Sequence, residues 1–271
     1  MYDNKIKYNN MNGIFLLYFL LIFLLGLCAG SFLNCVIYRL EQGKNLGGRS
    51  FCPHCKKDLS WKELFPIFSF LFLGGKCMGC RGKISIQYPL VELATALVFI
   101  LTFYFVYPIL VTYQLVYILY LFYVLSALII IFVYDLKHYE IPDKVLLPAI
   151  AITFLYTAIF SWQSILNYLL AVLVSAGFFL IIFLVSKGRG MGFGDVKLAV
   201  LMGLLLGLPS VLVALFIAFV LGAIMGVILM IFQRKGLKSE IPFGPFLVLG
   251  TIISLFWGGA VIQWYINFLQ I

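Results

Sequence analysis

The sequence predicts an all-α protein that crosses a membrane about eight times. The chain of 271 residues is 64% hydrophobic and only 11% charged, whereas a soluble domain averages roughly 45–50% apolar and about 25% charged residues. The apolar residues form long runs, and a spanning helix needs ~20 such residues. The run at 197–208 is short for a span. We expect helices near 13–38, 89–107, 113–134, 144–160, 165–186, 197–208, 210–232 and 243–269.

The basic residues predict how these spans are oriented. The chain has a net charge of +9, and 17 of its 19 Lys and Arg residues fall in four segments, at 39–88, 135–144, 187–197 and 233–242. The connectors between these segments carry no Lys or Arg. This alternation follows the positive-inside rule, which explains the charge without a nucleic-acid partner. We expect a multi-pass protein of the bacterial cytoplasmic (inner) membrane, with the lipid bilayer as partner and its basic loops in the cytoplasm.

The first basic segment differs from the others in its cysteines. It contains two C-x-x-C knuckles, Cys52–Cys55 and Cys77–Cys80, at a spacing close to that of four-thiolate zinc ribbons. Two disulfides or four unrelated thiols are the alternatives, but cytoplasmic thiols stay reduced. We therefore expect a structural zinc site in a cytoplasmic zinc-ribbon-like loop between the first two spans. The predicted parts are 1–38 (N-terminal tail and first helix), 39–88 (cysteine-rich loop) and 89–271 (membrane core).

Two acids follow or interrupt apolar runs in the membrane core. Asp135 ends the run at 113–134, and no structural role is evident for it. Asp195 lies in a stretch with alternating glycines, among them Gly192 and Gly194, and Lys197 follows it. Glycine permits close approach of backbone segments. We predict that Asp135 and Asp195 meet, with Gly192, Gly194 and Lys197 supporting the loop that carries Asp195.

Paired carboxylates suit the hydrolysis of a peptide bond. The reaction needs a base that activates water and an acid that protonates the leaving amine. Two carboxylates held close together cannot both ionise easily, so one keeps a proton and the pair supplies both roles. The sequence contains no serine nucleophile elbow, no zinc-protease His-Glu-x-x-His and no Walker phosphate loop. We therefore interpret the two acids as a candidate aspartic peptidase site.

Three further polar residues have competing interpretations. Asn34, late in the first span, is favoured as an interhelical hydrogen-bonding residue over a catalytic one. Glu92 lies inside an apolar run, which makes it a functional candidate, although a favourable helix-start charge explains it equally well. Asp143 follows Pro142 and is interpreted as a helix N-cap.

The ordered set of motifs resembles the type IV prepilin peptidases, also called bifunctional leader peptidase/N-methyltransferases, of the GxGD aspartyl protease family. The match covers most of the chain in order. It runs from Gly30-Ser31-Phe32-Leu33-Asn34 through both knuckles, Tyr88-Pro89-Leu90-Val91-Glu92, Asp135 with Ile141-Pro142-Asp143, Gly192-Phe193-Gly194-Asp195-Val196-Lys197 and Pro242-Phe243-Gly244-Pro245.

The resemblance implies an enzyme that cuts the basic leader from prepilins or pseudopilins at the cytoplasmic membrane face, typically after a glycine. Asp135 and Asp195 would be the catalytic acids. Family members with such a cysteine loop usually also methylate the new N-terminus with S-adenosylmethionine. The candidates for that second activity are Gly75, Lys76 and Glu92. Recognition of the basic leader would rest on its apolar helix and on acids such as Glu140 and Glu240.

Two other functions remain open at this point. A presenilin-like protease would cut deep inside the apolar segment of its substrate. A non-enzymatic transporter or assembly protein would use the aspartates to bind ions, and its substrates would be unaffected by loss of either acid.

Overall fold

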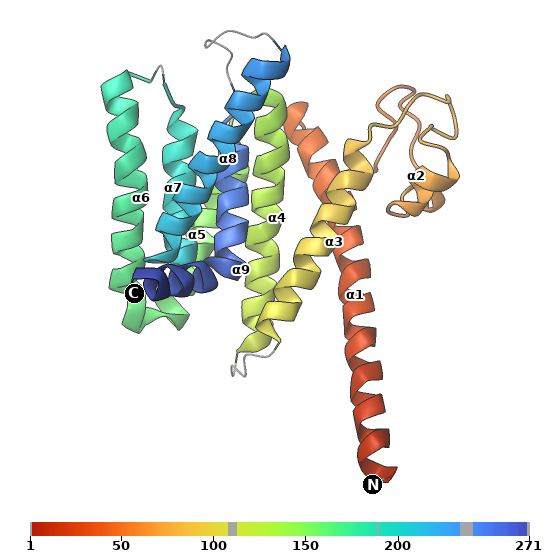
Figure 1. The fold of residues 1–271 in the computed structure, drawn as a ribbon. Helices are drawn as coiled ribbons and strands as arrows, with labels where there is room; N and C mark the ends of the chain where they lie inside the picture. Colours follow the sequence, from red (N-terminus) through yellow and green to blue (C-terminus); the bar gives the residue numbers. More distant parts are fainter. Residues whose placement is uncertain (1, 108–112, 189, 234–240, 270–271) are drawn as a thin grey trace. The chain divides into compact units, whose positions relative to one another are not determined.

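A computed structural model describes residues 2–107, 113–188, 190–233 and 241–269 of the chain (Figure 1). Over these residues the protein is nearly all helical, and its β-structure consists of two isolated bridges. The helices are α1 (Tyr2–Glu41), α2 (Phe68–Phe72), α3 (Gln87–Val106), α4 (Gln114–His138), α5 (Asp143–Phe160), α6 (Ile165–Ser186), α7 (Phe193–Leu206), α8 (Ser210–Gln233) and α9 (Gly244–Leu269). Short 3₁₀ helices lie at Trp61–Glu63 and Trp162–Ser164.

Seven of the described helices are long and apolar enough to cross a membrane. They correspond to α1, α3, α4, α5, α6, α8 and α9. The remaining predicted span, 197–208, forms α7, which has only 14 residues. At ~1.5 Å per residue, such a helix covers about 21 Å, less than the ~30 Å of a hydrocarbon core. The predicted all-α membrane fold is confirmed, and α7 is its short helix.

The chain divides into two compact units, 1–122 and 123–271, with the boundary inside α4. In the first unit α1 packs closely on α3. A Cβ atom added at Gly26 would lie 2.5 Å from the Cα atom of Ala96, so only glycine permits this approach. The Asn34 Nδ2 atom donates to the carbonyl oxygen of Tyr88 at 3.0 Å. The interhelical hydrogen bond predicted for Asn34 is therefore confirmed.

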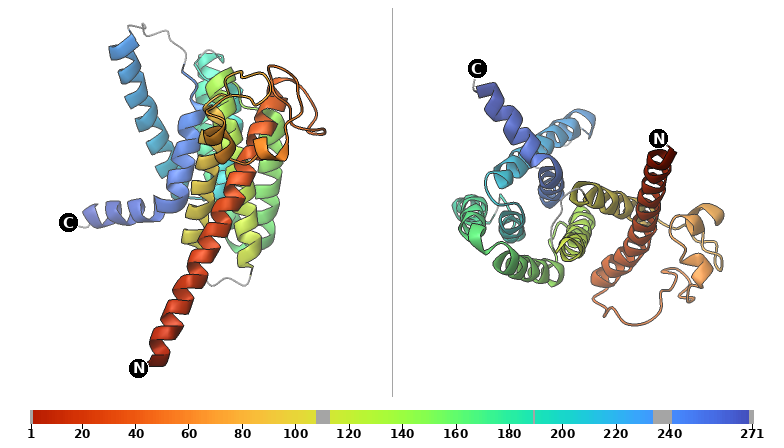
Figure 2. Two further views of the ribbon diagram at one scale, coloured as in Figure 1. Left: turned by 90° about the vertical axis from the view of Figure 1, so that its right-hand side faces the viewer. Right: turned by 90° about the horizontal axis from the view of Figure 1, so that it is seen from below.

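In the second unit the short helix α7 contacts α5, α6, α8 and α9 (Figure 2). Its buried side chains include Leu198, Leu201 and Met202, which are fully enclosed. A Cβ atom at Gly203 would lie 2.6 Å from the backbone nitrogen of Val172 in α6, so the two helices approach to backbone contact there. Because α5, α6, α8 and α9 all contact α7, packing holds the first residues of this helix in place.

Candidate active site and cysteine cluster

Asp135 lies in the last turn of α4, where its carboxylate is enclosed by other parts of the second unit. It is only 4% exposed. The backbone amide of Gly244, the first residue of α9, lies beside the carboxylate. A Cβ atom at Gly244 would overlap the Oδ2 atom of Asp135. Tyr139, with a φ of 59°, turns the chain out of the helix directly afterwards.

Asp195 lies in the first turn of α7. Gly192 is the N-cap of this helix, and Asp195 is therefore the third helical residue. An acid at this position reaches back to the N-cap amide and interacts favourably with the positive end of the helix dipole. The Gly192 amide does lie beside the Asp195 carboxylate, which is 8% exposed. The predicted loop around Asp195 is thus partly helix, because α7 begins four residues earlier than the sequence indicated.

The structure brings the two acids together. The charge of Asp135 acts directly on the carboxylate of Asp195. Ile141 fills the space beside them: a Cβ atom at Gly194 would lie 3.1 Å from its Cβ atom, and one at Gly244 would lie 3.4 Å from its Cδ1 atom. Glycines on two different helices therefore let the backbone approach Ile141 and the acids closely. The resulting site holds two interacting carboxylates at the ends of helices.

Lys197 forms an ion pair with Asp143, at the start of α5. The two side chains are partly exposed, so the pair contributes only about 0–1 kcal/mol of stability. Asp143 is the first helical residue and Pro142 is the N-cap, with no side-chain capping bond. The N-cap interpretation of Asp143 is therefore wrong, because its side chain is directed at Lys197 of another helix.

The four knuckle cysteines converge on one point in the first unit. All four are free thiols, and their Sγ atoms lie within 4.8 Å of one another. The backbone amides of Cys80 and Gly79 lower the pKa of Cys77 to about 7. The Gly82 amide favours the Cys80 thiolate, but burial and the neighbouring thiols raise its pKa to about 11. The cluster thus has the ligand type and the spacing that a tetrahedral metal ion requires.

The two knuckles repeat one backbone pattern. In each, an amide four residues on donates to the carbonyl oxygen of the first cysteine: Lys56 to Cys52 at 2.9 Å and Arg81 to Cys77 at 3.0 Å. Lys56 and Arg81 have φ values of 61° and 57°, a left-handed conformation that usually selects glycine. Because neither position holds glycine, these turns could not be predicted from residue type.

The three candidates for methyl transfer have different surroundings. Gly75 has a φ of 68°, and a Cβ atom there would lie 3.1 Å from the ring of Phe70. Lys76 forms an isolated bridge with Lys83. Glu92 is 6% exposed and its Oε2 atom accepts a hydrogen bond from the backbone N–H of Ile67 at 2.7 Å. Glu92 therefore connects α3 to the cysteine-rich loop, a contact that the sequence did not indicate.

Membrane-length helices, a buried carboxylate pair and a separate four-thiol loop define a polytopic membrane protein with the chemistry available to aspartic peptidases. Two family models match the chain: the bacterial peptidase A24 N-terminal domain at residues 24–106 and the type IV leader peptidase family at residues 122–227. The chain belongs to the type IV leader peptidase family.

Similar curated proteins span nearly the whole chain, and all three described here are named prepilin leader peptidase/N-methyltransferase. The protein from Aeromonas hydrophila is 33% identical over 95% of this chain and 97% of its own length. That from Legionella pneumophila is 34% identical over 92% and 95%. That from Bacillus subtilis (strain 168) is 32% identical over 91% and 97%. No solved structure is significantly similar to the chain.

Proposed function

We propose that this protein cleaves the leader peptide from type IV prepilins or pseudopilins and methylates the new N-terminal amine. The observation that carries the peptidase activity is the interacting pair Asp135 and Asp195, each enclosed and each beside a glycine amide. The similarity to prepilin leader peptidase/N-methyltransferases over nearly the full length supports both activities.

In this mechanism the carboxylate pair holds one proton. The ionised carboxylate takes a proton from water, and the water oxygen attacks the carbonyl carbon of the scissile peptide bond. As the carbon–nitrogen bond breaks, the protonated carboxyl group donates its proton to the leaving amine. The pair thereby acts as the base when water attacks and as the acid when the amine leaves. The titration belongs to the pair and not to Asp135 or Asp195 separately.

The position of the acids at helix ends supports cleavage at a membrane surface. Asp135 lies in the last turn of a span and Asp195 in the first turn of α7. With the basic loops in the cytoplasm of a bacterium, the site faces the inner side of the cytoplasmic membrane. The substrate's charged leader remains in the cytoplasm while its apolar helix lies among the spans. Glu140 is exposed and available to contact the basic leader, whereas Glu240 lies outside the described residues.

Methyl transfer belongs to the cysteine-rich loop in this proposal. S-adenosylmethionine, as co-substrate, supplies an activated methyl group to the new amine. Gly75 and Lys76, beside the second knuckle, remain the candidates for this activity. Glu92 acts on the loop through the Ile67 amide, so we assign it a positioning role. The predicted division at 1–38, 39–88 and 89–271 places the two activities in separate parts of the chain.

The cysteine cluster fits a structural zinc ion. Four thiolates occupy all positions of a tetrahedral ion, so no position remains open for catalysis. The loop contains little regular structure, and a bound ion therefore contributes much of its stability. The residues that would hold it are Cys52, Cys55, Cys77 and Cys80.

We expect about one zinc ion per chain in freshly purified, reduced protein. Replacing one thiol of each knuckle, in the double variant Cys52→Ser plus Cys77→Ser, removes two of four ligands and should reduce bound zinc to background. Elemental analysis measures this. Cys28→Ser, outside the cluster, is the matched control and should retain the metal. Absence of zinc from the unmodified protein would contradict the assignment.

Mass spectrometry of a prepilin co-expressed with this protein tests the function directly. We expect removal of the leader after its glycine, with the mass of one added methyl group on the new N-terminus. A cut deep within the substrate's apolar helix would favour the presenilin-like activity. An unprocessed prepilin would favour the non-enzymatic transporter or assembly role.

A further inference from the structure

The segment Trp61–Phe72, here called the aromatic segment, exposes large apolar side chains although it lies in the basic cysteine-rich loop. Phe72 is 88% exposed and Trp61 is 72% exposed. The exposed apolar residues of the segment are Trp61, Leu64, Phe65, Phe68, Leu71 and Phe72. Single exposed apolar residues are common, but a concentration of this kind indicates an interaction surface.

A buried carboxylate holds the segment against the side of a membrane-spanning helix. The Ile67 N–H donates to Glu92, and the Phe68 N–H donates to the Pro66 carbonyl oxygen at 2.6 Å. Ile67, with φ 60° and ψ −50°, is thus the centre of a classic γ-turn, which is rare and strained for a β-branched residue. Such a conformation persists only where its surroundings hold it, and the Glu92 carboxylate provides that hold.

The contact with Glu92 fixes the depth of the segment along the span. Glu92 lies in the second turn of α3, about 7.5 Å from its first residue by the ~1.5 Å rise per residue. The turn at Ile67 therefore lies beside the span and not beyond its end. Figure 1 shows α2 beside the end of α3 that the loop enters. If the hydrocarbon core begins near the first turn of α3, the segment lies at the boundary between headgroups and acyl chains.

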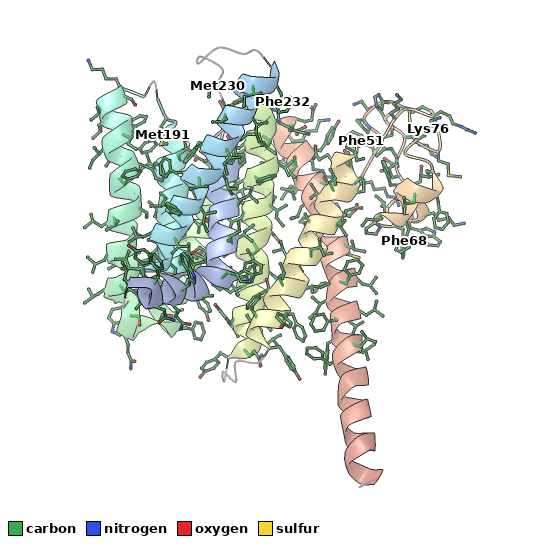
Figure 3. The ribbon with its side chains drawn as sticks, in the orientation of Figure 1. Phe51, Phe68, Lys76, Met191, Met230 and Phe232 are labelled. Atoms are coloured by element: carbon green, nitrogen blue, oxygen red, sulfur yellow. The ribbon has the colours of Figure 1, made fainter. Side chains whose placement is uncertain are left out.

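Phe68 of the aromatic segment and Lys76 lie on different sides of the loop. In Figure 3 Phe68 lies on the side directed along α3 toward the middle of the span, and Lys76 projects from the opposite side. Residues 39–88 contain nine Lys and Arg residues and only three acids. A positive loop that exposes the apolar side chains of the aromatic segment matches a bilayer surface that carries anionic headgroups above an apolar interior.

We propose that the aromatic segment is an interfacial membrane anchor, inserted among the lipids beside α3 and tethered there by Glu92. Its occupant is the lipid bilayer, because the segment lies beside a helix of membrane length that itself exposes Leu90, Leu93 and Leu97. Trp61 suits the headgroup level, where its ring is amphipathic, while Phe68, Leu71 and Phe72 enter the acyl region. Anchoring holds the cysteine-rich loop at the membrane surface.

Fluorescence quenching in proteoliposomes tests this proposal. The full-length protein is first made free of tryptophan by replacing its four Trp residues with Phe, and its prepilin cleavage and zinc content are checked. One tryptophan is then returned, as Phe72→Trp in the segment or as Leu46→Trp, a control at another exposed position of the loop. The vesicles contain anionic phospholipids brominated on their acyl chains, and iodide serves as the aqueous quencher.

The Phe72→Trp protein should lose most of its fluorescence to the brominated lipids and little to iodide. The Leu46→Trp protein should respond in the opposite way. Adding Glu92→Gln, which weakens the tether to Ile67, should reduce lipid quenching at position 72. Iodide access at position 72 equal to that at position 46 would overturn the proposal. Protection at position 72 from both quenchers would also overturn it, since a protein partner would then cover the segment.

Discussion

Replacement of either Asp135 or Asp195 with Asn should abolish leader cleavage, with a rate loss of about 10²–10⁴-fold or more. Asn keeps the size and the contact with the adjacent glycine amide, but it can neither take a proton from water nor donate one as an acid. Proton transfer by a positioned group contributes a rate factor of this order. The double variant should be no slower than the worse single variant, because the two acids act as one unit. Cleavage of a co-expressed prepilin, followed over time, measures the loss.

Thermal stability separates this catalytic role from a structural one. Asp135 and Asp195 are buried side by side, and ionisation of one disfavours ionisation of the other. Replacing one with a neutral amide should therefore leave the midpoint of unfolding unchanged or raise it. A site whose acids only supported the fold would instead lose stability with them. Asp58→Asn, an exposed acid in the cysteine-rich loop, is the control and should retain full activity. If the Asp195→Asn protein cleaved prepilin at the normal rate, the assignment of Asp135 and Asp195 as a catalytic pair would be wrong.

The features predicted correctly from the sequence are those that local patterns determine. Apolar runs of membrane length identified the helices, since lipid leaves few alternatives to a helix for such a run. The spacing within each knuckle placed two thiols together, and the like spacing of Cys52–Cys55 and Cys77–Cys80 indicated one shared cluster. Both signals are contained within short stretches of sequence.

Two other contacts between distant residues were not predictable in the same way. Lys197 and Asp143, 54 positions apart, form an ion pair that no local pattern distinguishes from two exposed charges. Ile67 adopts its turn because Glu92, 25 positions away, holds its amide. Its own residue type disfavours that conformation. Such contacts depend on how the helices pack, and packing overrides local preference.

The start of α7 shows how a correct motif was given the wrong local structure. The glycines before Asp195 suggested a loop, because glycine permits close backbone approach and unusual dihedral angles. Gly192 instead serves as the N-cap and the helix begins at Phe193. This places Asp195 in a fixed helical turn, where its direction is set by the backbone. A rigid element holds a reacting group more accurately than a loop does.

Gly244→Ala should reduce leader cleavage about 100-fold while the protein remains folded. The added methyl group would overlap the Oδ2 atom of Asp135, so the carboxylate or the start of α9 must move. A displacement of ~1 Å in a catalytic group costs a factor of about 10² in rate. The backbone of Gly244 is outside the left-handed region, and alanine therefore causes no conformational strain of its own. The rate of prepilin cleavage and the unfolding midpoint are measured together.

Gly226→Ala is the matched control, because a Cβ atom at Gly226 in α8 meets nothing within 4 Å. It should cleave prepilin at the normal rate. If Gly244→Ala protein also cleaved normally, the close approach of α9 to Asp135 would have no part in catalysis. If it lost activity only through unfolding, its midpoint would fall with the rate. Loss of rate at an unchanged midpoint is the result expected when the glycine makes room for a reacting carboxylate.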